Sequence, residues 1–233
     1  MKKIFLLLVG VSIFSFSGIS QDEVSIDSTG KMMNEQIILD INWLSWVNYP
    51  SEINLKPTSS EFILSYLHPL FGKKNRFSMA TGLALSTQNV KFDAYVSNSV
   101  YDEPTFMLFD DSVSYKTNKL TTVFVDIPIE FRLRTRNNIH QKNFKLSFGG
   151  RIGYLIKSYH KYAGDEYRFT TGTTTKFKEY NIPYLNKLHY GVFTKIFYGK
   201  FGMNVTYSLS TLFEKKFTPE IVPISIGVSM IFI

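Results

Sequence analysis

Charged side chains of both signs recur at alternate positions of several segments, and their chemistry has to be accounted for first. The set expected on the inward face of successive strands is Asp126, Glu130, Arg132, Lys145, Arg151, Lys187 and Lys195. Asp40 could meet the same cations. A charge removed from water must be paired or hydrated. The set therefore predicts an ion-paired network that fills a barrel, and a selective pore lining is the alternative.

A second group of residues has the side-chain types that a hydrolase uses. Ser158, His160 and Glu166 supply a nucleophile, a base and a carboxylate, which together could hydrolyse a lipid at a membrane surface. Nothing in their spacing requires that chemistry. The remaining histidines are scattered without metal-ligand spacing: His68, His140 and His189. We therefore expect no metal, no cofactor and no enzymatic activity.

The segment Thr87–Lys119 combines carboxylates with aromatic residues, but its spacing does not match a calcium-binding loop. Such a mixture suits contact with a partner or a glycan. A solvated loop, or a hairpin extension above a membrane, is the interpretation that we favour.

Composition narrows the cellular setting. The chain has no cysteine, which excludes disulfides and thiolate metal sites, and its formal net charge is +7. Lys2 and Lys3 followed by the apolar run Ile4–Phe16 predict a signal peptide over residues 1–20. Residues 21–35 would then form a periplasmic tail, and residues 36–233 the folded domain. An exported protein without a dense basic stretch is not expected to bind nucleic acid.

The elements that must position these side chains are strands. The segment Phe144–Lys157 alternates strictly, with large apolar residues on one face and mostly Gly, Ser and charged residues on the other. Small residues weaken a solvated strand but fit inside a narrow barrel. Eight such segments are expected: Gln36–Val47, Glu61–His68, Phe77–Ser86, Thr122–Leu133, Phe144–Lys157, Pro183–Tyr198, Phe201–Ser210 and Val222–Phe232. They predict an all-β fold, an eight-stranded antiparallel up-and-down transmembrane β-barrel.

The connections between these strands alternate in length, as they do in outer-membrane barrels. The short turns are Phe71–Arg76, Thr135–Lys142 and Gly199–Lys200. The outer loops are Asn48–Ser60, Thr87–Lys119, Ser158–Asn181 and Phe213–Glu220, of which the last is no longer than the second turn. This order predicts an integral outer-membrane protein with both termini in the periplasm.

Three short stretches carry a resemblance to a known family: Val125–Arg132, Phe148–Gly153 and Val222–Val228. They make the chain similar to the PorT-like outer-membrane β-barrel proteins of Bacteroidetes. The resemblance implies a barrel without a catalytic motif, and one member of that family is tied to secretion of cargo proteins.

We therefore expect a structural or interaction module, accessory to secretion or envelope assembly. A small passive pore and an outer-membrane lipid hydrolase are the alternatives. The expected partners are outer-membrane lipid and lipopolysaccharide, together with envelope or secretion proteins.

Overall fold

The computed structural model describes residues 36–71, 76–96, 106–110, 113–135, 143–166, 173–214 and 220–232. The signal peptide over 1–20 and the tail over 21–35 lie outside the described residues. Among the described residues, no helix is long and apolar enough to cross a membrane.

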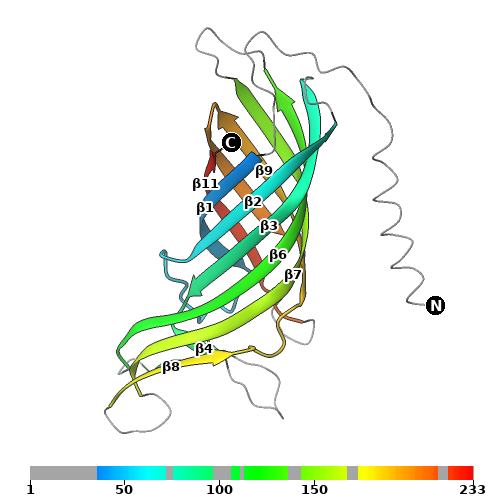
Figure 1. The fold of residues 1–233 in the computed structure, drawn as a ribbon. Helices are drawn as coiled ribbons and strands as arrows, with labels where there is room; N and C mark the ends of the chain where they lie inside the picture. Colours follow the sequence, from blue (N-terminus) through cyan, green and yellow to red (C-terminus); the bar gives the residue numbers. More distant parts are fainter. Residues whose placement is uncertain are drawn as a thin grey trace, which may run out of the picture. The chain divides into compact units, whose positions relative to one another are not determined.

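Eight strands form a closed antiparallel barrel, as the sequence predicts (Figure 1). They are β1 (Gln36–Val47), β2 (Ser60–Phe71), β3 (Phe77–Lys91), β6 (Tyr115–Arg134), β7 (Phe144–Asp165), β9 (Leu188–Tyr198), β10 (Phe201–Ser208) and β11 (Val222–Ile231). Each of these strands pairs with the next one in the series, and β11 pairs with β1 to close the ring. Closure leaves none of the eight as a free edge within the barrel wall.

Two of the predicted outer loops are largely strand. Strands β6 and β7 continue past the rest of the barrel, and β8 (Thr174–Tyr180) pairs with the end of β7 (Figure 1). A separate hairpin joins β4 (Ala94–Val96) to β5 (Phe106–Leu108). Thr87–Lys119 thus contains strand pairing of the kind that the hairpin-extension interpretation predicts, whereas the assignment of Ser158–Asn181 as an outer loop was wrong. Outside lipid a strand no longer needs one fully apolar face, so the alternation that reveals strands in the sequence fades there. We call this part of β6, β7 and β8 the extension.

A β-bulge in β7 separates the barrel from the extension. Phe124 pairs with Leu155, whereas the preceding residue Val123 pairs with Lys157, so Ile156 is an extra residue in β7. One extra residue shifts the alternation by one position. Ser158 and His160 consequently point inward and are buried, although strict alternation from Ile152 would have placed them outside.

The two faces of the barrel wall have opposite character. Phe148, Ile152 and Tyr154 are exposed on the outside, whereas Ser147 and Arg151 are buried inside, as the alternation predicts. An aromatic band runs across β2, β3, β6 and β7 near the short turns, through the ring pairs Phe71–Phe77, Phe77–Phe131 and Phe131–Phe148. Aromatic bands of this kind mark the boundary of the apolar layer of a membrane. Tyr184 packs against an apolar cluster at the loop-bearing end.

The exposed apolar face yields a first prediction. Ile127 lies mid-way along the barrel part of β6 and is 50% exposed, so Ile127→Arg would place a charge near the middle of the apolar layer. We expect a loss of about 2–4 kcal/mol in the free energy of unfolding. The measurement is urea unfolding in phospholipid vesicles, followed by the mobility difference between folded and unfolded protein on gels.

The matched control is Thr174→Arg, which adds the same charge to an exposed position on β8 in the extension. Its effect should stay within about 0.5 kcal/mol. Equal losses for the two variants would contradict the assignment of the outward face of the barrel to lipid.

Candidate functional site in the barrel interior

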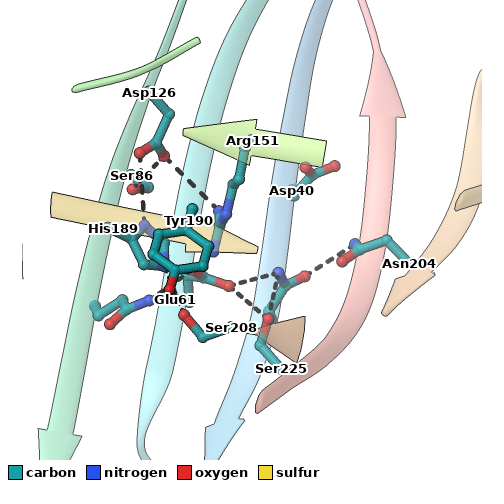
Figure 2. A network of polar contacts seen from close by, with 12 residues as sticks. Asp40, Glu61, Ser86, Asp126, Arg151, His189, Tyr190, Asn204, Ser208 and Ser225 are labelled. Atoms are coloured by element: carbon teal, nitrogen blue, oxygen red, sulfur yellow. Dashed lines mark hydrogen bonds and ion pairs between the residues drawn. The ribbon is translucent and has the colours of Figure 1, made fainter. Parts of the chain in front are cut away.

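Glu61 on β2 is the centre of a polar network inside the barrel (Figure 2). Its carboxylate accepts a hydrogen bond from Arg151 Nη2 at 2.8 Å and one from Gln88 Nε2 at 3.1 Å. The Nδ2 atom of Asn42 and the hydroxyl of Ser225 donate to its second oxygen, at 3.2 and 2.5 Å. A fully buried carboxylate with four donors has its hydrogen-bonding capacity nearly filled.

Arg151 connects Glu61 to a second carboxylate. Its Nη1 atom lies 3.9 Å from Asp126 Oδ2, and the hydroxyl of Ser86 donates to the same oxygen at 2.8 Å. The Nδ1 atom of His189 lies 3.6 Å from the other oxygen of Asp126 (Figure 2). Side chains of β2, β3, β6, β7 and β9 therefore meet on the barrel axis and tie the wall together from within.

Room for the Asp126 carboxylate depends on the facing residue. Gly153 is the cross-strand partner of Asp126, and a Cβ atom there would lie 1.7 Å from Asp126 Oδ1. A side chain at Gly153 would displace the carboxylate from the network. Gly149 and Gly153 thus serve close packing, since a Cβ atom at Gly149 would lie 2.0 Å from the carbonyl oxygen of Ile129.

Further charges pair nearer the short turns. Lys195 Nζ lies 2.6 Å from Asp40 Oδ2, and Arg132 Nε donates to Glu130 Oε1 at 2.7 Å. Lys145 Nζ lies 4.1 Å from the centre of the Phe197 ring and 3.4 Å from Gln36 Oε1. Among the described residues, the buried carboxylates and the buried lysines and arginines balance: Asp40, Glu61, Asp126 and Glu130 against Arg132, Lys145, Arg151 and Lys195.

The structure places six of the seven proposed network residues inside the barrel: Asp126, Glu130, Arg132, Lys145, Arg151 and Lys195. The seventh placement was wrong, because Lys187 is exposed and precedes β9. The backbone is irregular there, with positive φ at Asn181 and Tyr184, so the alternation extrapolated from β9 does not apply. Glu61 and His189 were missed. The alternation of Phe62, Leu64 and Tyr66 on the outer face could have revealed Glu61.

An apolar cluster closes the barrel at its loop-bearing end. We call it the apolar cap; it consists of Leu44, Trp46, Ile53, Val90, Phe92, Ala94, Leu120, Ile182, Leu185, Leu212, Phe213 and Ile221. Trp46 contacts Phe92 at a ring-centre distance of 5.5 Å and Phe106 at 6.2 Å. Strand ends and connecting segments thus fold inward over the mouth.

A smaller apolar cluster lies at the other end and contains Ile38, Leu67, Ala80, Phe197 and Ile231. We call it the apolar plug. Between plug and cap, the cavity lined by Asp40, Asp126 and Arg151 leaves about 20 Å³ for the centres of water molecules. That volume holds one or two waters.

The residues of the hydrolase alternative have structural partners. The Ser158 hydroxyl accepts a hydrogen bond from the backbone N–H of Ile182 at 3.0 Å. The His160 ring lies 2.5 Å from Asn118 Oδ1 and stacks on Phe92 of the apolar cap. Within the part of the chain that the structure describes, no group of three or more His, Asp or Glu side chains is arranged to hold a metal ion.

Comparison with known proteins agrees with this architecture. A family model described as an outer membrane protein beta-barrel domain matches residues 14–222. The chain belongs to this family of outer-membrane β-barrel proteins. No curated protein sequence matches it.

Two solved structures of Ail, the attachment invasion locus protein of Yersinia pestis, are similar to this chain. The structure in complex with the heparin analogue sucrose octasulfate shares 10% sequence identity, with a TM-score of 0.35. The other shares 11%, with a TM-score of 0.34. Each comparison covers 85% of this chain and 98% of the Ail chain.

The network of this outer-membrane barrel yields a second prediction. Glu61→Gln retains the shape of the side chain but leaves the buried Arg151 without its nearest countercharge. We expect the free energy of unfolding to fall by about 3–5 kcal/mol, the usual result of removing one partner of a buried ion pair. Urea unfolding in vesicles measures it.

Two controls accompany this variant. Glu52→Gln removes an exposed carboxylate and should change stability by less than about 0.5 kcal/mol. Combining Glu61→Gln with Arg151→Met should recover part of the loss, because the buried cation is then removed together with its nearest countercharge; recovery is only partial, since Asp126 loses its 3.9 Å contact with Arg151. A loss below about 1 kcal/mol for Glu61→Gln alone would mean that water hydrates the pair.

Proposed function

We propose that this protein is a non-conducting, non-enzymatic outer-membrane barrel that acts as a structural or interaction module through its loop-bearing end. The partners proposed are outer-membrane lipid and lipopolysaccharide, and envelope or secretion proteins. We propose in addition that the chain is a relative of the PorT-like proteins of Bacteroidetes, and that its role is accessory to secretion or envelope assembly.

The observation that carries the non-conducting assignment is the succession of three layers along the barrel axis. The apolar plug, with Glu130, Arg132 and Lys145 beside it, comes first, the network around Glu61 follows, and the apolar cap closes the other end, with space for one or two waters in the cavity at the centre. An ion would have to pass the packed side chains of the apolar cap and displace paired charges along the rest of the axis. These features weigh against the passive pore.

The connections support an orientation. The strand ends that short connections join lie at one end of the barrel, and the strand ends that longer connections join, with the extension, lie at the other. Outer-membrane barrels keep short turns in the periplasm and longer segments outside. We therefore propose that both ends of the barrel domain face the periplasm and that the extension faces the cell exterior.

The hydrolase alternative is weaker. Ser158 and His160 are both buried beneath the connecting segments, and Ser158 receives a backbone hydrogen bond. A nucleophile has to be reached by its substrate and activated by a base within hydrogen-bonding distance. The observed partners instead hold the backbone at Ile182 in place.

Planar-bilayer recording tests the non-conducting assignment. Purified wild-type protein should show no steady conductance, and Phe92→Ala with Phe213→Ala should also show none, because the charge network below the cap still fills the barrel. A larger porin inserted by the same procedure provides the positive control. Reproducible open channels in the wild type would overturn the proposal and favour the pore.

Single cysteines test the orientation, since the natural chain has none. Ser51→Cys lies in an exposed loop after β1, and Lys200→Cys lies in the turn between β9 and β10. An impermeant maleimide added to intact cells should label the cysteine at position 51 and not the one at 200. Lysed cells should show labelling of both, and the reverse pattern on intact cells would refute the orientation.

A further inference from the structure

Four lysines form a row across four neighbouring strands at the loop-bearing end. Lys91 of β3 pairs with Lys119 of β6, Lys119 pairs with Lys161 of β7, and Lys161 pairs with Lys178 of β8. Directly opposed residues of antiparallel strands have their side chains on the same face. The inward neighbours Leu120, His160 and Tyr162 are buried, so the lysine row lies on the outer face.

The surroundings of the row do not neutralise it. Lys119 Nζ donates to Asn89 Oδ1 at 3.0 Å, and Lys91 Nζ donates to Thr58 Oγ1 at 3.1 Å. Lys178 Nζ lies 3.8 Å from the centre of the Tyr159 ring. Over the described ranges, none of the four lysines forms an ion pair with a carboxylate.

Further lysines add to the same face. Lys157 lies two positions before Tyr159 on β7, and Lys176 lies two positions before Lys178 on β8; both are exposed. Asp165, at the tip of β7, is the carboxylate found on the outward positions of β6, β7 and β8, and its Oδ2 accepts the N–H of Ser114. The described outer face of the extension is therefore strongly positive.

Such a row is costly for the folded protein by itself. Like charges directly opposite each other on neighbouring strands are destabilising. Lysines often protect a free strand edge, but that explanation applies to β8 alone, since β6 and β7 are paired on both sides. Three successive like-charge pairs indicate that a polyanion supplies the countercharge.

The position of the row identifies the kind of polyanion. It lies on the same outward side of β7 as the exposed apolar residues Tyr154 and Ile156, at the end of the lipid-facing surface. A strand rises about 3.3 Å per residue, so Lys161 lies roughly 17 Å along β7 from Ile156, and less along the tilted barrel axis. The row therefore lies beyond the apolar surface, in the direction of the polar headgroup region that covers the hydrocarbon core. Tyr159 of β7 lies between Ile156 and Lys161, and its ring centre is 5.9 Å from that of Tyr180, its cross-strand partner on β8.

We propose that the lysine row, with Lys157 and Lys176 beside it, binds the phosphate groups of lipopolysaccharide in the outer leaflet. This rests on the proposed orientation, which places the extension outside. Lysine is a compact charge suited to phosphate without a fixed geometry. Phosphates on neighbouring glycolipid molecules would occupy the row from the side, where the barrel meets the membrane, and leave the distal loops free for a protein partner.

Binding of purified lipopolysaccharide to the full-length folded protein in a zwitterionic detergent tests the proposal. Lys161→Gln with Lys178→Gln should weaken binding by about tenfold or more, because each lysine adds to attraction toward an anionic surface. Arg76→Gln with Lys200→Gln removes the same charge from exposed positions at the short-turn end and should leave binding unchanged. Dephosphorylated lipopolysaccharide should bind the wild type as weakly as the first variant binds the native lipid.

Stability supplies a readout that does not depend on binding. In zwitterionic detergent without lipopolysaccharide, Lys161→Gln with Lys178→Gln should be at least as stable as the wild type, since repulsion is relieved. Added lipopolysaccharide should stabilise the wild type more than this variant. Equal binding of lipopolysaccharide by the two double variants would overturn the proposal. It would also be overturned if the wild type bound soluble polyphosphate as tightly as it binds lipopolysaccharide, because the row would then be assigned to a soluble polyanion.

The cysteine labelling described above separates this inference from the proposed function. If the cysteine at position 51 is labelled on intact cells but Lys161→Gln with Lys178→Gln binds lipopolysaccharide as tightly as the wild type, the lysine site alone is refuted. Reversed labelling would refute the orientation and, with it, the assignment of the row to the outer leaflet.

Discussion

The hydrogen bonds between β1 and β11 are the constraint on which the rest of the structure depends. Lipid hydrocarbon offers no partner to a backbone N–H or C=O group, so a sheet can cross it only as a closed ring. The ladder from Ile38–Ile231 to Val47–Val222 closes the ring between the first and the last strands of the domain. The barrel therefore cannot be complete until its last strand has formed.

A ring of eight strands leaves an interior that side chains must fill. This chain fills it with an apolar cap at one end, and with ion pairs in the middle and beside the apolar plug at the other end. Ion pairs cost desolvation, but removing one partner costs more. Each pair also joins strands far apart in sequence, as Glu61 and Arg151 do. The network thus favours one register of the wall, and it leaves the outer surface as the place for interaction.

Strict alternation made the barrel predictable: the bounds of β1 and the lipid-facing residues of β6 and β7 follow from it. A hairpin extension was expected for Thr87–Lys119 as one interpretation, but the bounds of the extension and the part formed by β7 and β8 were not predictable, because these strands lie outside lipid and both faces are mixed. Nor was the bulge at Ile156, since the extra residue is defined only by the pairing with β6. Lys187 was wrongly predicted to lie inside the barrel, because the alternation of β9 was extended into the irregular segment that precedes this strand. Glu61 was missed although the alternation of its own strand placed it inside. The lysine row depends on the register of four strands, which one sequence does not reveal.

The two tryptophans of the chain lie on opposite faces of β1. Trp43 is 50% exposed on the lipid-facing side, whereas Trp46 is 2% exposed within the apolar cap. Brominated lipids should therefore quench the fluorescence of Trp43 when the strand enters the bilayer. The emission of Trp46 should shift to shorter wavelength only when the connecting segments have folded over the mouth. The natural chain thus carries two internal optical reporters that resolve insertion and closure as separate events in time.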